Sequence, residues 1–479
     1  MPEIETPNIF VTAQQENRAN NPSALSVPLL IVCGIVIPVL LAYGFAVGNE
    51  LQILAIILGI LGVGLIAARP FTGLILFVAL LYTRPEDSIH VLAGMHFTLI
   101  IAVVTLISMF VKMLLDREVV ARNPAVPLYI GFAIMAVISA LPLGTVSDTA
   151  QDVAKLVALI LLVVNLTRTP ERFRALVTAV LLFTSYAASY SIFLYFNGGG
   201  LNDQSVLRSQ SVGLFENPND LADVLVVGLA LSISRLFSSS WLQRAGYGVL
   251  VALSITAIML TQSRGGMLAM LIVSFVCILS YFRSKWMAVI VAIVVVGALF
   301  LGASGRMTNF NNEEESANSR FHYWTNAIDH FVSSPLIGVG YANFHGVNGG
   351  AEAHNSFVTV FVETGFPGYF FWMGALFYAF RPRPKEHPAP DIPPALMSDI
   401  TGIKIALFGY LVGSFWSNHP YNMILFLIVG VACVGNIASH PGFLPLQISR
   451  KTLVKDAGWI ALIAACSIVI INLIALKNG

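Results

Sequence analysis

Residues 318–331 read NSRFHYWTNAIDHF and lie in the middle of a polar run, residues 303–353, in an otherwise almost continuously apolar chain. The apolar members of this stretch recur every three or four residues, at Phe321, Trp324, Ile328 and Phe331. This spacing predicts an amphipathic helix that lies on a membrane surface, and Pro335 is expected to end it. The polar run is therefore predicted to be a folded loop and not a linker.

The rest of the chain has the composition of a polytopic membrane protein. Of its 479 residues, 57% are hydrophobic and 11% are charged, and the mean hydropathy is +0.80. These values lie far from those of soluble globular proteins. A net charge of +1 and the lack of a basic cluster give no reason to expect a nucleic-acid partner.

The cysteines are dispersed through apolar segments, at Cys33, Cys277, Cys433 and Cys466. Such positions favour small, buried, hydrophobic side chains. We therefore expect neither a disulfide nor a metal site from them.

A segment of about 20 apolar residues can span a bilayer. The sequence has up to fifteen such segments, near residues 24–47, 51–68, 70–83, 94–115, 126–142, 151–166, 175–196, 219–237, 245–261, 265–282, 286–302, 355–380, 403–417, 421–438 and 457–475. Segments 70–83 and 403–417 are short, so half-spanning pieces are among them. The expected fold is an all-α polytopic membrane protein with about 12–15 transmembrane helices.

The distribution of basic residues predicts the orientation in the membrane, because short cytoplasmic loops carry an excess of Lys and Arg. With the N-terminus inside, the inner loops hold eighteen Lys and Arg residues and the outer side holds six. The outer six are Arg84, Arg208, Arg264, Arg306, Arg320 and Lys477. The polar run 303–353 is thus predicted to lie outside, which in a bacterium means in the periplasm.

Four regions follow from this pattern. Residues 1–23 are polar and lack the basic start of a cleaved signal peptide, so we predict a disordered cytoplasmic tail. Residues 24–302 are expected to form a bundle of transmembrane helices. Residues 303–353 form the one large periplasmic loop, with its interfacial helix, and residues 354–479 the C-terminal transmembrane helices.

Two of the outer arginines are candidates for binding an anion. Arg264 lies in the tight turn QSRGG, residues 262–266, between two apolar segments, so it should face something anionic at the membrane surface. Its alternative role is to reach lipid headgroups. Arg320 lies on the amphipathic helix, where a charge on the solvated face is the simpler interpretation.

His354 stands where the polar run returns to the membrane. The apolar segment that follows carries Ser356, Thr359 and Glu363 at helical spacing, which predicts one polar stripe. A carboxylate in an apolar helix is costly and is a functional candidate. A helix rises about 1.5 Å per residue, so Glu363 is too far away to be the hydrogen-bond partner of His354. We expect it to brace the bundle or to bind backbone groups freed by a break at residues 365–368.

Two further outer segments are polar. The loop 197–220 ends with Asn217 and Asn219 on either side of Pro218. This arrangement indicates a turn and a helix N-cap, and its oxygen atoms are equally suited to contact a sugar. The turn SNHPYN, residues 417–422, has the same two interpretations.

Together these motifs resemble the O-antigen ligase and O-antigen polymerase superfamily. The matching elements, in chain order, are Gly213–Ala222, Ser263-Arg264-Gly265, Arg320–Ala327, Pro335–Gly340, His354-Asn355 and Glu363-Thr364-Gly365. Their order and spacing over residues 213–368 carry the resemblance. Residues 1–200 match only as a run of membrane helices.

The resemblance implies a metal-independent, inverting glycosyltransferase of the GT-C type in the bacterial inner membrane, with no cofactor. Such enzymes take a glycan from an undecaprenyl-diphosphate carrier on the periplasmic side and join it to an acceptor. The implied partners are therefore the carrier-linked glycan donor, a glycan or lipid A core acceptor, and the lipid bilayer.

Carried over to this sequence, Arg264 and Arg320 match the family arginines that hold the diphosphate, and His354 matches the essential histidine on the acceptor side. Guanidinium groups suit bidentate recognition of phosphate and would neutralise charge on the leaving group. An imidazole can remove a hydroxyl proton near neutral pH. Further candidates are Asn217, Asn219 and Asn355 for substrate binding, and Glu363 and Trp324 as structural residues.

Several functions stay open at this point. A lipid A core acceptor, as in a ligase, is favoured over another carrier-linked glycan, as in a polymerase, or a protein hydroxyl. A lipid-linked glycan transporter should show inverted repeats and broken helices that meet at the midplane, whereas the informative residues here collect on one face. A metal-dependent enzyme would rest on Glu86 and Asp87 in the outer loop 84–93, a pair that is more typical of a solvated turn.

Overall fold

The structure of the chain is a computed structural model, which describes residues 50–88, 96–121, 123–203, 206–281, 311–381, 392–438 and 449–478. The predicted tail 1–23, the predicted spans 24–47 and 286–302, and residues 303–310 of the outer loop lie outside the described residues. Within the described part, nine helices are long and apolar enough to cross a membrane. These helices confirm the prediction of an all-α polytopic membrane protein.

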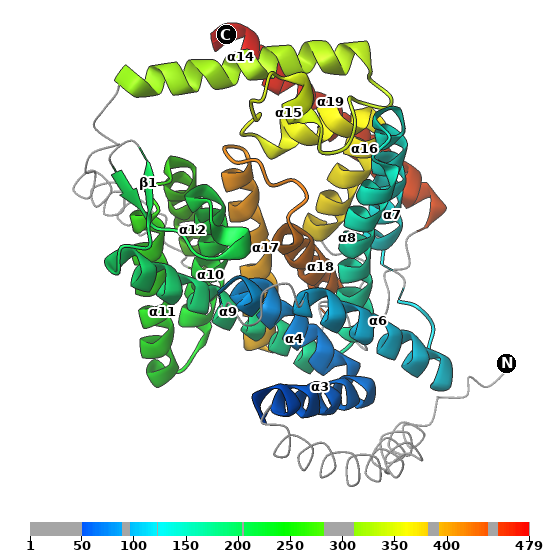
Figure 1. Cartoon of the computed structure of the whole chain (residues 1–479), viewed down its shortest axis with the longest axis vertical. Coiled ribbons are helices and arrows are strands. Elements are labelled where there is room, and N and C mark those ends of the chain that lie inside the picture. Colours follow the sequence, from blue (N-terminus) through cyan, green and yellow to red (C-terminus); the bar gives the residue numbers. More distant parts are fainter. Residues whose placement is uncertain are drawn as a thin grey trace, which may run out of the picture. The chain divides into compact units, whose positions relative to one another are not determined.

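Figure 1 labels most of the elements that the structure describes. The helices of membrane-spanning length are α6 (Phe97–Leu115), α7 (Ala125–Ala140) continued by the 3-10 turn η2 (Leu141–Leu143), α8 (Val146–Leu166), α9 (Pro170–Phe196), α10 (Pro218–Ser238), α11 (Trp241–Leu260), α12 (Arg264–Tyr281), α17 (Pro394–Ser414) and α19 (Arg450–Asn478). The other helices are α4 (Pro70–Thr83), α5 (Pro85–Ser88), η3 (Gly213–Phe215), α14 (Asn311–Ser333), α15 (Phe344–Val347), α16 (Ser356–Phe380) and α18 (Met423–Ala438). Helix α3 (Glu50–Ala68) belongs to a separate unit, residues 1–70, and is described by itself.

Every predicted apolar segment within the described residues coincides with a helix. The expectation of a short helix at 403–417 was wrong, because α17 has 21 residues and begins at Pro394. Proline suits the first turn of a helix, where its missing N–H has no partner to lose. The first part of α17 contains the polar residues Ser398 and Asp399, which bond to Ser234 and Arg235 of α10. A search for continuous apolar segments therefore misses this part of the helix.

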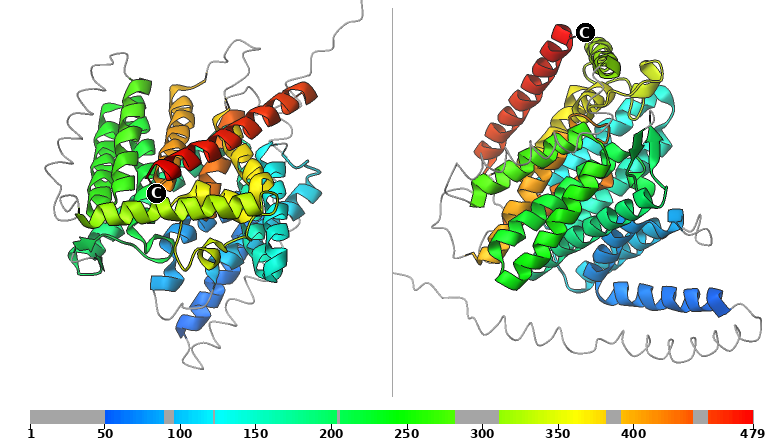
Figure 2. Two further views of the ribbon diagram at one scale, coloured as in Figure 1. Left: turned by 90° about the horizontal axis from the view of Figure 1, so that it is seen from above. Right: turned by 90° about the vertical axis from the view of Figure 1, so that its left-hand side faces the viewer.

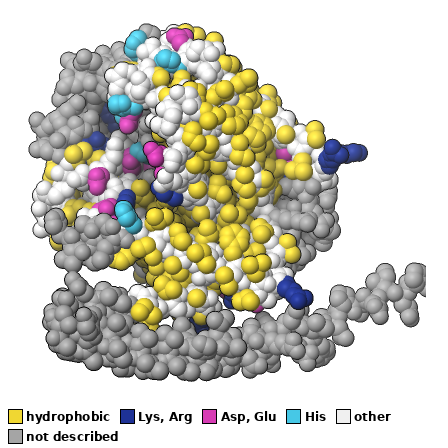
Figure 3. All heavy atoms as spheres, turned by 45° about the vertical axis from the view of Figure 1, so that its right-hand side comes forward, with side chains coloured by type: hydrophobic (Ala, Val, Ile, Leu, Met, Phe, Trp, Pro, Cys, Tyr) yellow, Lys and Arg dark blue, Asp and Glu magenta, His cyan; other side chains and the backbone are white. Residues whose placement is uncertain are grey.

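Helix α10 lies at the centre of its neighbours α9, α11, α12 and α17, and its apolar side chains are buried on all sides. Figure 2 shows these helices running side by side. By contrast, α6, α11 and α19 expose Ile107, Val249 and Leu473, and exposed apolar residues cover much of the face drawn in Figure 3. Such surfaces suit contact with lipid.

One buried carboxylate ties three helix ends together. Asp399 of α17 is 1% exposed and lies 2.7 Å from Arg235 Nε of α10 and 3.3 Å from Arg174 Nε of α9. Removing Asp399 would leave the buried Arg235 with an uncompensated charge, and such a loss costs about 3–5 kcal/mol. These three side chains therefore fix the ends of α9, α10 and α17 that lie away from His354.

A short antiparallel hairpin interrupts the otherwise helical chain within the predicted outer loop 197–220. Strand β1 (Leu201–Asp203) pairs with β2 (Val206–Arg208), with Leu201 opposite Arg208. The hairpin was not predicted, because a three-residue strand is too short to show a recognisable alternation of apolar and polar residues.

Helix α14 confirms the helix predicted over residues 318–331, and it ends at Ser333, two residues before Pro335. Trp324 is fully buried, and its ring packs edge-on against Phe415 with 5.7 Å between centroids. Phe331 packs in the same way against Phe361, at 5.3 Å. The apolar face of α14 therefore lies on the bundle, across α16 and α19 (Figures 1 and 2). Contact of α14 with the membrane surface stays a prediction.

Helix α16 is broken at Gly365, whose φ is 67°. Residues 335–340 take up the hydrogen bonds that the break frees: the amides of Val339 and Gly340 donate to the carbonyls of Val362 and Glu363, at 2.9 and 3.1 Å. A Cβ atom on Gly338 would lie 2.4 Å from the Glu363 carbonyl oxygen. Gly338 therefore has no room for a side chain, because the backbone of segment 335–340 packs directly against the backbone of α16.

Candidate active site

Arg320 of α14 and His354 line the same cavity, which has a volume of about 500 Å3. The remaining lining residues are Tyr323, Gly349, Gly350, Ala351 and Glu352. Two of the three predicted catalytic residues are therefore brought together, although 34 positions of sequence separate them. In Figure 3, acidic, basic and histidine side chains gather along one side of the face, beside a broad hydrophobic surface.

The backbone on both sides of His354 is held in place. Trp324 Nε1 donates a hydrogen bond of 2.7 Å to the carbonyl oxygen of Ala353. On the other side, Asn355 Oδ1 accepts from the amides of Phe357 and Val358, at 3.0 and 3.2 Å, and caps α16. His354 itself has a φ of 46°, a left-handed conformation that is uncommon for a residue with a side chain. Trp324 and Asn355 thus position His354 at the edge of the cavity.

The imidazole of His354 is easier to keep neutral than an ordinary histidine. Burial lowers its pKa below the usual value of 6.5, and the positive charge of Arg320 lowers it further. Glu352 opposes this shift, and its Oε2 lies 4.0 Å from His354 Nδ1. At neutral pH the side chain is therefore an imidazole with a free lone pair, the form that accepts a proton.

Arg264 does not line this cavity. It is the first residue of α12 and its side chain is exposed. The two glycines that follow let α12 begin in close contact with its neighbours: a Cβ on Gly265 would lie 3.0 Å from Trp416 Cβ, and one on Gly266 would lie 2.4 Å from Ala222 Cβ. The start of α12 is thus wedged between the start of α10 and the turn after α17.

The predicted polar stripe of α16 faces that same turn, residues 415–422. Ser356 Oγ donates to the Ser417 carbonyl oxygen and accepts from the amide of His419, both at 2.9 Å. Thr359 Oγ1 donates to Asn418 Oδ1. The turn SNHPYN therefore joins the helix that follows His354 to the ends of α17 and α18, which is a structural role for residues that were also considered for sugar binding.

A buried acid and histidine cluster lies on the other side of the turn. His419 Nε2 pairs with Asp220 Oδ1, and Ser417 Oγ donates to Asp223 Oδ2 at 2.5 Å. Burial alone would lower the pKa of His419, but the hydrogen bond and the negative charge of Asp220 outweigh it and raise the pKa above its usual value. His419 is also close enough to His354 for its charge to lower the pKa of His354.

Asp220 and Asp223 were not among the predicted site residues. Two acids three residues apart at the start of an apolar helix were a signal that could have identified them. Their partners Ser417 and His419 lie in the polar turn 417–422 that the sequence marked, but no sequence signal connects that turn with these acids.

Glu363 binds loop backbone and a tyrosine. It is 2% exposed, and it accepts hydrogen bonds from the amides of Ala342 and Phe344, at 3.0 and 2.9 Å, and from the Tyr421 hydroxyl, at 2.6 Å. The expectation that it braces the bundle agrees with these contacts. Its side chain does not bind the backbone freed by the break at 365–368, because the amides of residues 339, 340 and the carbonyl of residue 335 fill that role.

Arg208, which the sequence marked only as an outer cation, is buried with 5% exposure. Its Nε donates to the Thr261 carbonyl oxygen and its Nη2 to Asn219 Oδ1, both at 2.9 Å. Asn219 is therefore engaged with an arginine, and Asn217 Oδ1 caps α10 by accepting from the Asn219 amide at 2.9 Å. Asn217 is exposed and lies outside the cavity of Arg320 and His354.

Asn355 has one further property. Its side chain is fully buried, and its Nδ2 has no hydrogen-bond partner among the described residues. Buried polar atoms are rarely left unpaired, so this donor is suited to an acceptor atom beyond the helix cap. It does not line the cavity.

The two carboxylates of the predicted outer loop 84–93 each have a protein partner. Asp87 Oδ2 lies 2.8 Å from Arg84 Nε, and Glu86 Oε1 accepts from Thr98 Oγ1 at 2.9 Å. Within the part of the chain that the structure describes, no three His, Cys, Asp or Glu side chains are grouped so that they could hold a metal ion.

The arrangement can be compared with known families. Residues 249–373 match the family model described as O-antigen ligase. This range contains Arg264, Arg320, His354 and the part of α16 that includes its break at Gly365. Arg320 and His354 line the cavity, and the start of α12 and the polar stripe of α16 contact the turn 415–422. No curated protein matches the chain. The match over residues 249–373 supports the resemblance of this region to the O-antigen ligase and polymerase superfamily.

Proposed function

We propose that this protein transfers a glycan from an undecaprenyl-diphosphate carrier to lipid A core on the periplasmic face of the bacterial inner membrane. The observation that carries the proposal is the cavity shared by Arg320 and His354. It places an anion-binding group beside a proton acceptor, the two functions that transfer from a diphosphate requires.

His354 acts as the general base in this proposal. The acceptor hydroxyl loses its proton to the neutral imidazole as its oxygen forms a bond to the anomeric carbon. The bond between that carbon and the diphosphate oxygen breaks, and its electron pair leaves with undecaprenyl diphosphate. Attack opposite the leaving group inverts the configuration at the anomeric carbon. The contact of 4.0 Å between His354 Nδ1 and Glu352 leaves Nε2 for the acceptor.

The arginines bind the diphosphate and replace a metal ion. Guanidinium groups bind phosphate oxygens in pairs and stay charged at any physiological pH. Arg320 reaches the donor from the cavity, and Arg264 reaches it from the exposed start of α12. The helix N-terminus at Arg264 adds a partial positive charge, which favours an anion.

Reconstitution with undecaprenyl-diphosphate glycan and candidate acceptors tests this function. A single glycan added to lipid A core indicates a ligase, a ladder on carrier-linked glycan indicates a polymerase, and a modified protein indicates a protein ligase. His354→Ala should abolish transfer while the purified protein still binds the donor. Translocation of the donor without any covalent product would refute the enzyme and indicate a transporter.

His345→Ala provides the matched control, because His345 is exposed in the same outer segment and does not line the cavity. General-base assistance contributes about 10²–10⁴-fold in rate. The proposed role is supported if His354→Ala lowers the transfer rate by about 10²-fold or more while His345→Ala stays near the rate of the unmodified protein. Equal losses in both variants would indicate a disturbed loop instead.

A further inference from the structure

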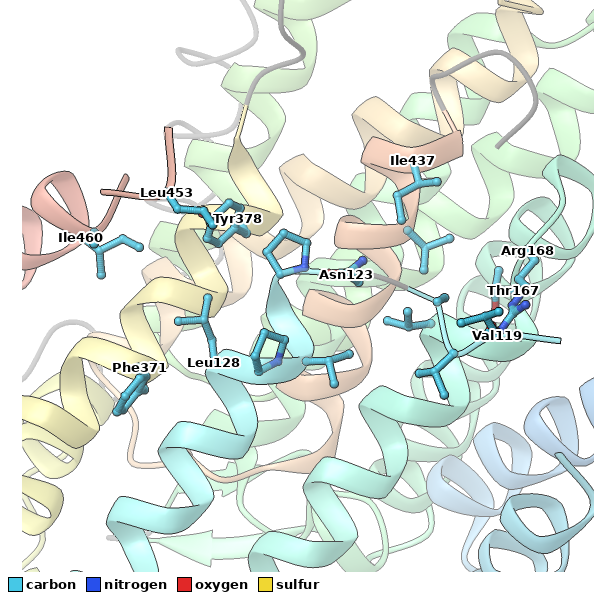
Figure 4. A pocket seen from close by; sticks show the side chains of 18 of the residues that line it. Val119, Asn123, Leu128, Thr167, Arg168, Phe371, Tyr378, Ile437, Leu453 and Ile460 are labelled. Atoms are coloured by element: carbon cyan, nitrogen blue, oxygen red, sulfur yellow. Dashed lines mark hydrogen bonds between the residues drawn. The ribbon is translucent and has the colours of Figure 1, made fainter. Parts of the chain in front are cut away.

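A second, larger cavity lies where α8 and α16 end and α19 begins (Figure 4). Its volume is about 1370 Å3. Most of its lining is apolar and comes from α7, α8, α16, α18 and α19 and from the segment that precedes α7. None of the predicted catalytic or substrate-binding residues lines it. A site here would therefore be separate from the one around His354.

Three polar atoms in the wall of this cavity are buried and lack a partner among the described residues. They are Asn123 Nδ2, Thr167 Oγ1 and Arg168 Nε. Asn123 is 5% exposed and Thr167 is fully buried. An amide NH2, a hydroxyl and a guanidinium N–H can all donate hydrogen bonds. Three residues of the lining thus carry donors that no described protein atom satisfies.

The other nitrogens of Arg168 are already bound. Its Nη1 lies 3.1 Å from Glu118 Oε2, and its Nη2 donates to the Val119 carbonyl oxygen at 2.8 Å and to Asn165 Oδ1 at 2.9 Å. These bonds fix the plane of the guanidinium. Its Nε–H is therefore a fixed donor, and Glu118 offsets part of its charge.

The donors lie toward one side of the cavity. Figure 4 shows Thr167 and Arg168 at one side, beside Val119, with Leu128 and Phe371 at the other side and Asn123 between them. Around the rim, Val119 and Leu453 are exposed apolar side chains, at 73% and 46%. An occupant that satisfies this wall needs hydrogen-bond acceptors at one end and a hydrocarbon chain at the other.

We propose that this cavity binds an anionic glycerophospholipid. Phosphate oxygens accept from the three donors, and an acyl chain lies along the apolar wall. Water could pair with the polar atoms but would leave the apolar wall unfavourably hydrated. The volume exceeds the roughly 300–1,000 Å3 of typical small-molecule pockets. The neighbouring segments 112–124 and 166–174 also carry more Lys and Arg than Asp and Glu, which favours an anionic headgroup.

Mass spectrometry of the full-length protein, purified in mild detergent, should detect one retained phospholipid per chain. After delipidation, phosphatidylglycerol should raise the melting temperature by several degrees, because a ligand that binds only the folded state stabilises it. Phosphatidylcholine and inorganic phosphate should each raise it much less. Equal shifts with both lipids would show that no headgroup is recognised, and a full shift with phosphate alone would show an ion site. Both results would overturn the proposal.

Two variants assign the effect to this cavity. Thr167→Val removes one donor without changing the volume, and its control is Thr184→Val, at a buried threonine that bonds to its own helix at 2.7 Å. Ala457→Trp fills the cavity from an exposed position, and its control is Leu462→Trp, also exposed on α19 but outside the lining. Each test variant should lose most of the phosphatidylglycerol shift, and each control should keep it. A shift retained in Ala457→Trp would place the lipid elsewhere and overturn the proposal.

Discussion

The Tyr421 hydroxyl donates a hydrogen bond of 2.6 Å to Glu363 Oε2, and it joins the turn between α17 and α18 to the middle of α16. The same carboxylate accepts from the amides of Ala342 and Phe344 in the predicted outer loop 303–353. One buried group therefore joins α16, which follows His354, to two segments that are distant in sequence.

Tyr421→Phe should lower the stability of the protein and its transfer rate together. A hydrogen bond contributes about 0.5–1.5 kcal/mol, or up to about 3 kcal/mol when its acceptor is charged, and its loss leaves a buried Glu363 oxygen with one partner fewer. Thermal unfolding of the purified protein measures the change. The control is Tyr186→Phe, at a ring that is 40% exposed. Unchanged stability in Tyr421→Phe would show that the bond to Glu363 is dispensable.

Glu352→Gln should move the acid limb of the activity profile to lower pH. The negative charge of Glu352 raises the pKa of His354, so removing the charge lowers that pKa and keeps the imidazole neutral in more acidic solution. Activity at neutral pH should change little. The measurement is kcat/KM between about pH 5 and 8, where histidine titrates, with the exposed Glu216→Gln as the control. A limb that stays in place or moves to higher pH would contradict His354 as the base.

Arg264→Lys and Arg320→Lys should each reduce transfer much more than protein level. Lysine keeps the positive charge but loses the planar fork that binds two phosphate oxygens. Donor binding and transfer are measured on the same preparations. Arg84→Lys is the control, because it is another predicted outer arginine, salt-bridged to Asp87 at 2.8 Å. Near-normal transfer by both test variants would assign these arginines to lipid headgroups instead.

Gly338→Ala should be strongly destabilising, on the order of 3 kcal/mol or more. Gly338 has a φ of +78°, and a Cβ there would lie 2.4 Å from the Glu363 carbonyl oxygen. Gly246→Ala in α11 meets no atom within 4 Å and should be neutral or stabilising by up to about 1 kcal/mol. The melting temperature and the yield of purified protein are measured for both variants. Similar behaviour of both variants would refute the close packing at the break.

Cysteine labelling tests the predicted orientation. With Cys33, Cys277, Cys433 and Cys466 replaced, a membrane-impermeant thiol reagent applied to whole cells should label Asn311→Cys. It should label Pro384→Cys only after lysis, because that residue lies in a predicted inner loop rich in basic residues. Labelling of Pro384→Cys in intact cells would reverse the topology.

The sequence by itself determined the helices and the faces they present. Apolar runs and helical spacing depend only on neighbouring residues, so α14 was predicted from the spacing of four apolar side chains, and the stripe of Ser356, Thr359 and Glu363 from their period. The same local logic marked His354 and the two arginines as candidates and carried the family resemblance that residues 249–373 confirm.

Only the tertiary structure decided which of these groups meet. Asp220 pairs with His419, and Arg208 with Thr261 and Asn219, across stretches of chain that no local pattern connects. Helix α14 was predicted to lie on the membrane surface, but its spacing alone cannot distinguish lipid from protein as the partner of its apolar face, because both are equally apolar. The structure packs Trp324 and Phe331 against the bundle. Periodicity specifies that a side chain is buried, whereas the partner of a buried polar group depends on how distant segments pack.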